Sequence, residues 1–270
     1  MRTGSDSSIG GRDSDTAENR TRQGDRRPGR AGIIVVGIGP GAEADMTIGA
    51  RDALRASDVI VGYKSYVKTI EKYAHGKEVH QFAMRKEIER CKKAIELAQE
   101  GKTVALISSG DPGIYGMAGL LLELAADIND IDIEILPGVS AVNAAASAFG
   151  APLMHDFAVI SLSDLLTPWE KIEKRLRAAA SADFVTALYN PKSTKRNWQI
   201  RTAQDIFMQF RDPKTPVGVY IKSNGEQNCH ISDIASFLGL PIDMNTTVII
   251  GNSQTYVADG RIITPRGYRV

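Results

Sequence analysis

The chain has 270 residues, of which 43% are apolar, so it can form one large or two medium-sized domains with a hydrophobic core. Lys and Arg number 33 against 32 acidic residues, and the net charge of +1 argues against general nucleic-acid binding and for a small-molecule partner. The only two cysteines, Cys91 and Cys229, form no CxxC motif, which argues against a metal cluster and fits the cytoplasm. No apolar run has the length of a membrane-spanning helix.

Residues 1–30 are rich in Arg, Ser, Gly and acidic residues and poor in large apolar ones. Such a segment cannot bury enough apolar surface to offset the entropy lost on ordering. We therefore predict a disordered N-terminal extension. Its composition weakly resembles an organellar transit peptide, but its acidic residues argue against that interpretation.

The first predicted strand runs from Gly32 into a glycine-rich loop that ends at Gly41. Its consecutive apolar residues suit a strand that is buried on both faces, and therefore parallel and central. The loop lacks the spacing of a dinucleotide-binding fingerprint, because Pro40 interrupts it and no third glycine opens the next helix. A helix capped by Thr47 is predicted to reach Ala56, followed by a strand over 58–62.

A basic segment follows, on a helix predicted to end near Gly101. Most clusters of this kind are solvated helix faces, and binding of an anion is the alternative. The segment carries Arg85, Lys86, Arg90, Lys92 and Lys93.

The most informative loop spans Ser108–Gly116, between a strand over 103–107 and a helix over 117–126. A strand, a loop rich in Gly and Pro, and a helix are the unit that places small-molecule sites at the carboxyl edge of a parallel sheet. Asp111 is the charged side chain of this loop, suited to accept hydrogen bonds from a ligand. Alternatively, the loop is only a turn and Asp111 caps the helix.

A further strand over 132–136 is closed by Pro137 and Gly138, and a helix of small residues, opened by Ser140, extends to Phe149. Ser140 and Ala141 at the start of this helix are well placed for a ligand, although small residues serve tight packing equally well. The segment 150–153 is interpreted as an interdomain connection.

The second half alternates strands and helices again, which predicts a second α/β domain. Asp259 and Gly260 lie between two short β-like runs and predict a hairpin. The domains are therefore expected at 31–150 and 151–270. The predicted strands are 157–162, 184–189, 216–222 and 247–251, and the predicted helices are 169–180, 197–210 and 233–238.

Three motifs together resemble the tetrapyrrole methylases. They are Gly-Ile-Gly-Pro-Gly followed by Met46 and Thr47, then Ser-Gly-Asp-Pro-Gly-Ile-Tyr, then Pro-Gly-Val-Ser-Ala, in that order. The resemblance covers residues 32–268 and implies two unlike α/β domains with S-adenosylmethionine bound in the cleft between them. Segments 161–169, 189–193 and 247–255 resemble the branch that methylates C17 of precorrin-3B or its cobalt complex, with ring contraction.

The resemblance also implies a set of site residues. The methyl donor is expected to contact Pro40, Gly110, Asp111, Pro112, Ile114, Tyr115, Ser140 and Ala141 from the first domain, and Leu188, Tyr189 and Asn190 from the second, with Asn252 or Ser253 as less firm candidates. The donor is then held largely by backbone groups, which accounts for the many glycines in these loops.

Methyl transfer itself depends mainly on positioning, whereas ring contraction requires proton transfer. The candidates for proton transfer are Asp164, His155, Asp156 and Tyr189; for His155 a purely structural role is the simpler interpretation. Because the tetrapyrrole substrate carries many carboxylates, Lys192, Lys195, Arg196, Arg85 and Lys86 are expected to bind it, with a solvated helix start as the alternative for the first three. No metal ligand is expected.

The sequence predicts a cytoplasmic homodimer that binds neither nucleic acid nor membranes. The alternatives are a sister methylase acting at C11 or C20 and a catalytically silent tetrapyrrole- or nucleotide-binding protein. A nicotinamide oxidoreductase is disfavoured by the glycine spacing. The segment from Lys222 to His230 departs from the glycine-arginine-rich turn of related proteins, which puts the local substrate contact in doubt.

Overall fold

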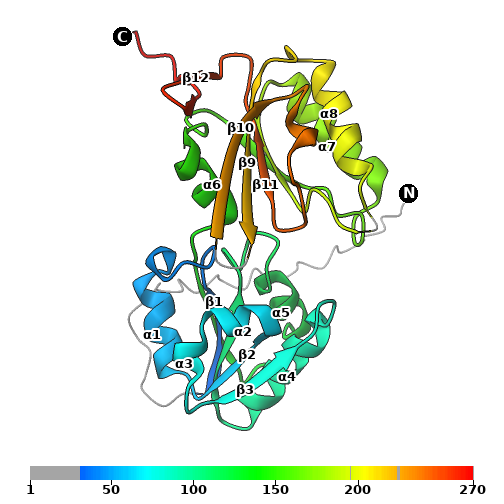
Figure 1. Ribbon diagram of the computed structural model, residues 1–270. Helices are drawn as coiled ribbons and strands as arrows, with labels where there is room; N and C mark the ends of the chain where they lie inside the picture. Colours follow the sequence, from blue (N-terminus) through cyan, green and yellow to red (C-terminus); the bar gives the residue numbers. More distant parts are fainter. Residues whose placement is uncertain (1–30, 195, 224–225, 270) are drawn as a thin grey trace, which may run out of the picture. The chain divides into compact units, whose positions relative to one another are not determined.

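The computed structural model describes residues 31–194, 196–223 and 226–269. The predicted N-terminal extension lies outside the described residues. The chain from Ala31 onward forms one compact unit that contains two five-stranded sheets and a three-stranded one (Figure 1). None of the helices in the described part of the chain has the length and apolar character needed to cross a bilayer.

The first sheet is parallel throughout, with strand order β3-β2-β4-β1-β5. All six residues of β1 are buried between β4 and β5, which confirms the predicted central parallel strand. Because all five strands run the same way, their carboxyl ends share one edge, and the predicted ligand loops follow these ends. The strands are β1 (Gly32–Gly37), β2 (Val59–Tyr63), β3 (Glu78–Phe82), β4 (Thr103–Ser108) and β5 (Asp132–Leu136).

Helices cover both faces of this sheet, because alternate residues of a strand point to opposite sides. Ile33 and Val35 pack against α4 and α5, whereas Ile34 and Val36 pack against α1, α2 and α3. Thr47 caps α1 as predicted, since its hydroxyl accepts from the backbone N–H of Ala50 at 3.1 Å. The elements are η1 (Glu43–Asp45), α1 (Ile48–Ala56), α2 (Lys64–Thr69), α3 (Glu71–Ala74), α4 (Glu87–Gln99) and α5 (Ala118–Leu124).

The second sheet is mixed, with strand order β10-β9-β11-β8-β7. Only β7 and β8 are parallel among its neighbouring pairs, and the other pairs are antiparallel. The two sheets are therefore unlike, as the resemblance implies. The elements are β7 (Phe157–Ser161), α7 (Trp169–Ser181), β8 (Val185–Tyr189), α8 (Gln199–Met208), β9 (Pro216–Ser223), β10 (Glu226–Asp233), η2 (Phe237–Gly239) and β11 (Thr247–Ile250).

Three strands were not anticipated: β3, β10 and the short β6 (Gly150–Ala151). β3 and β10 are edge strands whose sequences, EVHQF and EQNCHISD, are largely polar and lack the apolar run of a buried strand. The helix predicted over 233–238 is wrong: Asp233 ends β10, and only the short 3-10 helix η2 follows.

Helix α6 (Ala141–Phe149) packs against the second sheet, although it precedes that sheet in the chain (Figure 1). Phe149 lies against Gly218 of β9, where an added Cβ would come within 2.6 Å of the ring. Helix α6 therefore belongs to the core of the second sheet. The expected connection over 150–153 instead contains β6 (Gly150–Ala151), which pairs in parallel with β13 (Arg261–Ile263).

The predicted hairpin is confirmed. β12 (Tyr256–Ala258) and β13 pair antiparallel, and Asp259 and Gly260 between them have φ values of +47° and +68°. These left-handed conformations are those of a tight two-residue hairpin turn.

Candidate functional site

Three glycine-containing loops meet at the carboxyl edge of the first sheet. Gly39 and Gly110 exchange backbone hydrogen bonds of 3.2 and 2.8 Å. A Cβ on Gly138 would lie 2.1 Å from the carbonyl oxygen of Gly110, so only glycine fits there. The loops that contain Pro40, Gly110 and Pro112 are therefore in direct contact with the loop that leads to α6, as the sequence predicts for one site.

Asp111 links these loops to one another. Its Oδ1 accepts from the backbone N–H of Gly113 at 2.8 Å and its Oδ2 from that of Gly138 at 3.2 Å. The first bond closes a local turn, and the second ties this loop to the loop before α6. Asp111 does not cap the helix, because the N-cap of α5 is Met117. The carboxylate thus organises the loops.

The start of α6 is joined to the end of β8. Ser140 caps α6 as predicted, and Ala141 is its first residue. The hydroxyl of Tyr189 accepts from the backbone N–H of Val142, in the first turn of α6, at 2.7 Å. Burial raises the pKa of the Tyr189 phenol, and the hydrogen bond from Val142 offsets this only in part, so the phenol is neutral at physiological pH.

Two non-glycine residues of the predicted donor site have left-handed backbones. Tyr115 has a φ of +53° and Asn190 a φ of +50°. The Tyr115 hydroxyl donates to the carbonyl of Val159 and accepts from the N–H of Ser161, both at 3.1 Å. The Asn190 side chain donates to the Ser161 hydroxyl at 3.0 Å. Such conformations are held at a cost and often mark functional sites.

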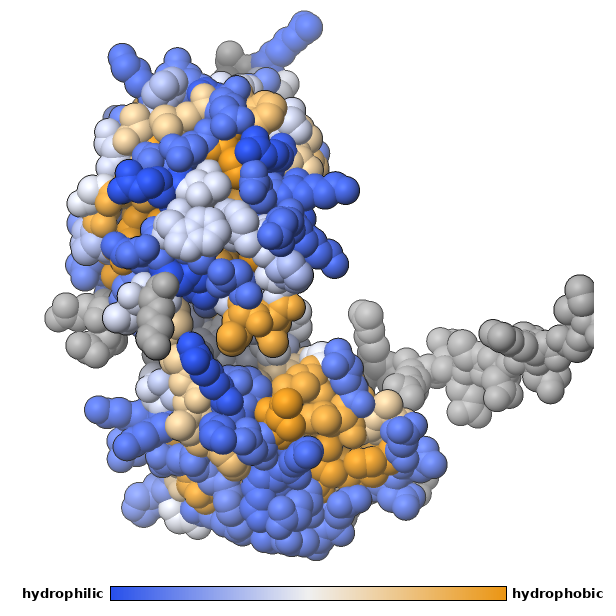
Figure 2. All heavy atoms as spheres, turned by 90° about the vertical axis from the view of Figure 1, so that its right-hand side faces the viewer, coloured by the Kyte–Doolittle hydropathy of each residue, from blue (hydrophilic) through white to orange (hydrophobic). Residues whose placement is uncertain are grey.

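The ring centroids of Tyr115 and Tyr189 lie 5.7 Å apart, so the loop over 108–116 and the end of β8 are neighbours. Leu188, the preceding residue of β8, is fully buried, whereas Ile114 is exposed. Leu165 and Leu166 in the loop after β7 are also exposed, the latter by 93%. Figure 2 shows apolar surface among the charged surface of both parts of the chain that carry the large sheets.

Arg196 is bound within the protein. Its Nη2 donates to the carbonyl of Asn190 at 2.8 Å, and its Nη1 donates to the hydroxyl of Ser163 at 3.0 Å. Burial lowers the pKa of Arg196, partly offset by Asp164. Asp164 itself accepts from the side-chain amide of Gln199 at 2.9 Å. Arg196 therefore stabilises the left-handed Asn190 rather than projecting freely toward a substrate.

His155 and Asn252 do not join this cluster. Along β7 and β8, Phe157 pairs with Val185 and Ser161 pairs with Tyr189. His155 precedes Phe157, so it lies at the end of β7 opposite to Ser161, and these two ends are separated by roughly 13 Å of strand. β11 runs antiparallel to β8, which puts Asn252 at that same far end, next to the start of β8. The structure therefore does not bring either residue together with Tyr189.

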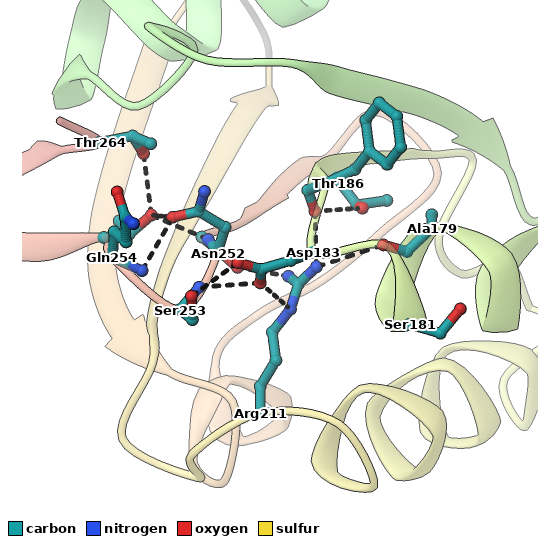
Figure 3. Close-up of polar contacts among 12 residues, drawn as sticks. Ala179, Ser181, Asp183, Thr186, Arg211, Asn252, Ser253, Gln254 and Thr264 are labelled. Atoms are coloured by element: carbon teal, nitrogen blue, oxygen red, sulfur yellow. Dashed lines mark hydrogen bonds and ion pairs between the residues drawn. The ribbon is translucent and has the colours of Figure 1, made fainter. Parts of the chain in front are cut away.

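Asn252 instead belongs to a structural network (Figure 3). Its side chain accepts from the N–H of Gln254, and the adjacent Ser253 donates its hydroxyl to Asp183 at 2.6 Å. The buried Arg211 donates to the carbonyls of residues 179, 184 and 251 and pairs with Asp183. Burial lowers the pKa of Arg211 to about 10, and Asp183 offsets this in part.

The remaining predicted substrate residues that the structure describes are exposed. Lys86 forms an exposed ion pair with Glu89 at 2.6 Å on α4. Arg85 has a left-handed φ of +66° and is exposed, as is Lys192. Lys195 lies outside the described residues. Sequence reasoning missed Ser161, which joins Tyr115 to Asn190; the parallel register of β7 with β8 puts it there, and no sequence motif signals that register.

Comparison with known proteins defines the class. The model of the Tetrapyrrole (Corrin/Porphyrin) Methylases matches residues 32–222. The chain therefore belongs to this family of methyltransferases, as the motifs indicate.

Proteins that are similar to this chain include methyltransferases named for cobalt-factor III. A "Probable cobalt-factor III C(17)-methyltransferase" of Salmonella typhimurium is 51% identical over 239 residues, which are 87% of this chain and 99% of that protein. A "Cobalt-factor III methyltransferase" of Priestia megaterium is 46% identical over 88% of this chain, which spans only 45% of that longer protein. The crystal structure of the methyltransferase CobJ matches with a TM-score of 0.80 and 37% identity, covering 87% of this chain and all of CobJ.

Proposed function

We propose that the chain transfers a methyl group from S-adenosylmethionine to C17 of a cobalt-factor III or precorrin-3B type tetrapyrrole, with ring contraction, in cobalamin biosynthesis. The observation that carries the proposal is the 51% identity to a probable cobalt-factor III C(17)-methyltransferase over nearly its whole length. Both curated relatives described above are named for cobalt-factor III, which favours the cobalt-containing substrate.

The loops at the carboxyl edge of the first sheet suit the methyl donor. Their backbones approach so closely at Gly110 and Gly138 that no side chain fits between them there. When bound, S-adenosylmethionine supplies an electrophilic methyl group. We assign Pro40, Gly110, Pro112, Ile114, Tyr115, Ser140, Ala141, Leu188, Tyr189 and Asn190 to its surroundings.

In this proposal the protein promotes methyl transfer mainly by positioning the reacting groups, and less by acid–base chemistry. Asp111 holds two donor loops together, and Arg196 and Ser161 hold Asn190 in its left-handed conformation. A fixed geometry of this kind converts binding energy into alignment of the reacting groups.

Ring contraction requires a proton donor or acceptor, and Tyr189 and Asp164 are the proposed candidates. Tyr189 is a neutral phenol whose hydroxyl accepts the N–H of Val142 and can donate its own proton. Asp164 retains Oδ1 in addition to the oxygen that Gln199 binds. Lys192 and Lys195 are proposed to bind substrate carboxylates, as are Arg85 and Lys86.

The proposal is tested with purified protein, S-adenosylmethionine labelled at the methyl carbon, and the tetrapyrrole with and without cobalt. One labelled methyl at C17 of a contracted ring, located by NMR and mass spectrometry, is the expected result. Label at C11 or C20 would identify a sister methylase, and S-adenosylhomocysteine binding without transfer to either substrate would indicate a silent binding protein.

We also propose that the protein is a homodimer located in the cytoplasm. Sedimentation equilibrium of the purified protein tests the assembly, because the mass of one chain is 29.2 kDa. A mass near that value at micromolar concentration would contradict a dimer.

A further inference from the structure

Arg90 is a buried cation with few hydrogen-bond partners. Its side chain, in the first turns of α4, is 4% exposed. One nitrogen, Nη2, donates to Oε1 of Glu87 at 2.9 Å, while Nε is buried and has no hydrogen-bond partner among the described residues. A guanidinium has five N–H donors, and a buried polar group without a partner is costly. This arrangement suggests that a further acceptor completes the site.

An aromatic ring lies next to this guanidinium. Its central carbon lies 5.9 Å from the ring centroid of Tyr63, which packs edge-on against Tyr66 at 5.0 Å. Burial raises the pKa of the Tyr66 phenol, and the charge of Arg90 and a hydrogen bond with Ser109 offset this in part. The ring of Tyr63 thus contacts both the Arg90 guanidinium and the ring of Tyr66.

This cluster lies at the carboxyl edge of the first sheet. Tyr63 ends β2, and Ser109 directly follows β4 and opens the loop that contains Asp111. The basic segment that was considered for anion binding includes Arg85, Lys86 and Arg90, and the first two of these are exposed. Arg90 is the basic residue of that segment that the fold turns inward.

The contact with Glu87 indicates which ligand fits. Glu87 has a side chain that is 46% exposed, so it can move away from Arg90 without unfolding the helix. It already presents a carboxylate oxygen to the guanidinium, and planar guanidinium groups prefer carboxylates as partners.

A second group of basic residues lines a hollow on the surface, and it is a weaker candidate for a carboxylate-binding site. It is lined by Arg55, Lys72, Tyr73, His75 and Lys77. Its lysines and arginine already have partners: Lys72 pairs with an acidic residue, Arg55 with another, and Lys77 donates to backbone carbonyls.

We propose that Arg90 binds a carboxylate of the tetrapyrrole substrate, and that Glu87 occupies this position in the free protein. The inference rests on the proposed function, because a tetrapyrrole of this pathway supplies the carboxylate. Substrate binding then requires Glu87 to yield its contact with Arg90. Arg90 therefore raises the affinity for the substrate, whereas Glu87 lowers it.

The test uses Arg90→Gln, Arg90→Lys and Glu87→Gln, with Lys93→Gln as the control. Lys93 lies on the same helix and forms an ion pair with Glu96, but it is not part of the cluster. Uroporphyrin III, a tetrapyrrole with eight carboxylates, is titrated by fluorescence as the probe, and S-adenosylhomocysteine is titrated by calorimetry. Thermal unfolding of each variant is recorded in parallel.

Arg90→Gln is expected to raise the Kd for the probe about tenfold or more, because a hydrogen-bonded charge pair is lost. Arg90→Lys should recover part of this loss, Glu87→Gln should lower the Kd, and Lys93→Gln should leave it unchanged. The Kd for S-adenosylhomocysteine should stay within about twofold of the wild-type value in all four.

An unchanged probe Kd in a folded Arg90→Gln variant would overturn the proposal. If Arg90→Gln does not fold, Glu87→Gln decides: an unchanged or higher Kd would show that the ion pair is only structural. The proposed function fails separately, if the wild-type protein transfers no methyl group to C17 while the Arg90 variants still lose probe affinity.

Discussion

Replacing Asp111 by alanine removes the carboxylate that links the loop over 108–116 to the loop before α6, both of which we propose to bind the methyl donor. The variant loses the hydrogen bonds from the N–H groups of Gly113 and Gly138, at 2.8 and 3.2 Å. We expect donor affinity to fall at least tenfold while the fold persists. The reason is loss of loop order, because both carboxylate oxygens already accept hydrogen bonds within the protein.

The magnitude follows from these two bonds. Hydrogen bonds to charged groups contribute about 1.5–3 kcal/mol each, but Asp111 is only half-buried, so about 1 kcal/mol each is the better value. The sum of about 2 kcal/mol corresponds to roughly a 30-fold change in affinity if the loops must be ordered to bind the donor. It is small beside the typical unfolding free energy of about 5–15 kcal/mol, so the variant should fold.

Calorimetric titration with S-adenosylhomocysteine, paired with urea denaturation, measures both quantities. Asp111→Asn is informative because an amide offers one acceptor oxygen and can restore only one of the two bonds. Asp127→Ala, at an exposed position after α5, is the matched control and should bind like the wild type. Donor affinity within twofold of the wild-type value in Asp111→Ala would refute this reasoning.

Gly138→Ala should reduce donor affinity more than tenfold, since its Cβ would lie 2.1 Å from the carbonyl oxygen of Gly110; an alanine variant that binds the donor normally in calorimetry would show that the loops can separate freely. Arg211→Ala should lower the free energy of unfolding by about 3–5 kcal/mol, because buried carbonyls and a carboxylate lose their donor. A urea midpoint equal to that of the wild type would contradict this. Cys91 is buried and its pKa is raised to about 11 by burial, whereas Cys229 is exposed. Ellman's reagent at pH 8 should therefore titrate one thiol in the native protein and two in urea; two fast thiols in the native protein would rule this out.

Local signals predicted the parts of the fold that depend on neighbouring residues. The buried run of β1 is apolar on both faces, and the hydroxyls of Thr47 and Ser140 cap helices where the sequence places them. The turn at Asp259 and Gly260 requires left-handed residues, which is why this pair is recognisable. Gly37 and Gly138 were recognisable for the related reason that a Cβ on either would meet backbone atoms within 2.5 Å.

Features that depend on strand direction could not be predicted in this way. An apolar run such as β11 reads the same whether it is parallel or antiparallel to its neighbour, yet the antiparallel choice sends Asn252 to the far end of β8. The roles of charged residues were equally hidden. Arg196 and Arg90 resemble ordinary surface cations in the sequence, and only the fold shows that one binds the Asn190 carbonyl and the other is buried.

The packing of α6 also has a consequence for synthesis of the chain on the ribosome. The five strands of the first sheet are complete once residue 136 has emerged, but α6 packs against strands that extend to Ile250. At about 5–20 residues per second, its apolar face waits roughly 5–20 s for its partners. A stalled chain in which a flexible linker follows α6, so that the helix lies outside the ribosome, should therefore bind a hydrophobic dye or a chaperone at this helix. Phe149→Ser should weaken that binding, and equal binding by both chains would refute the idea.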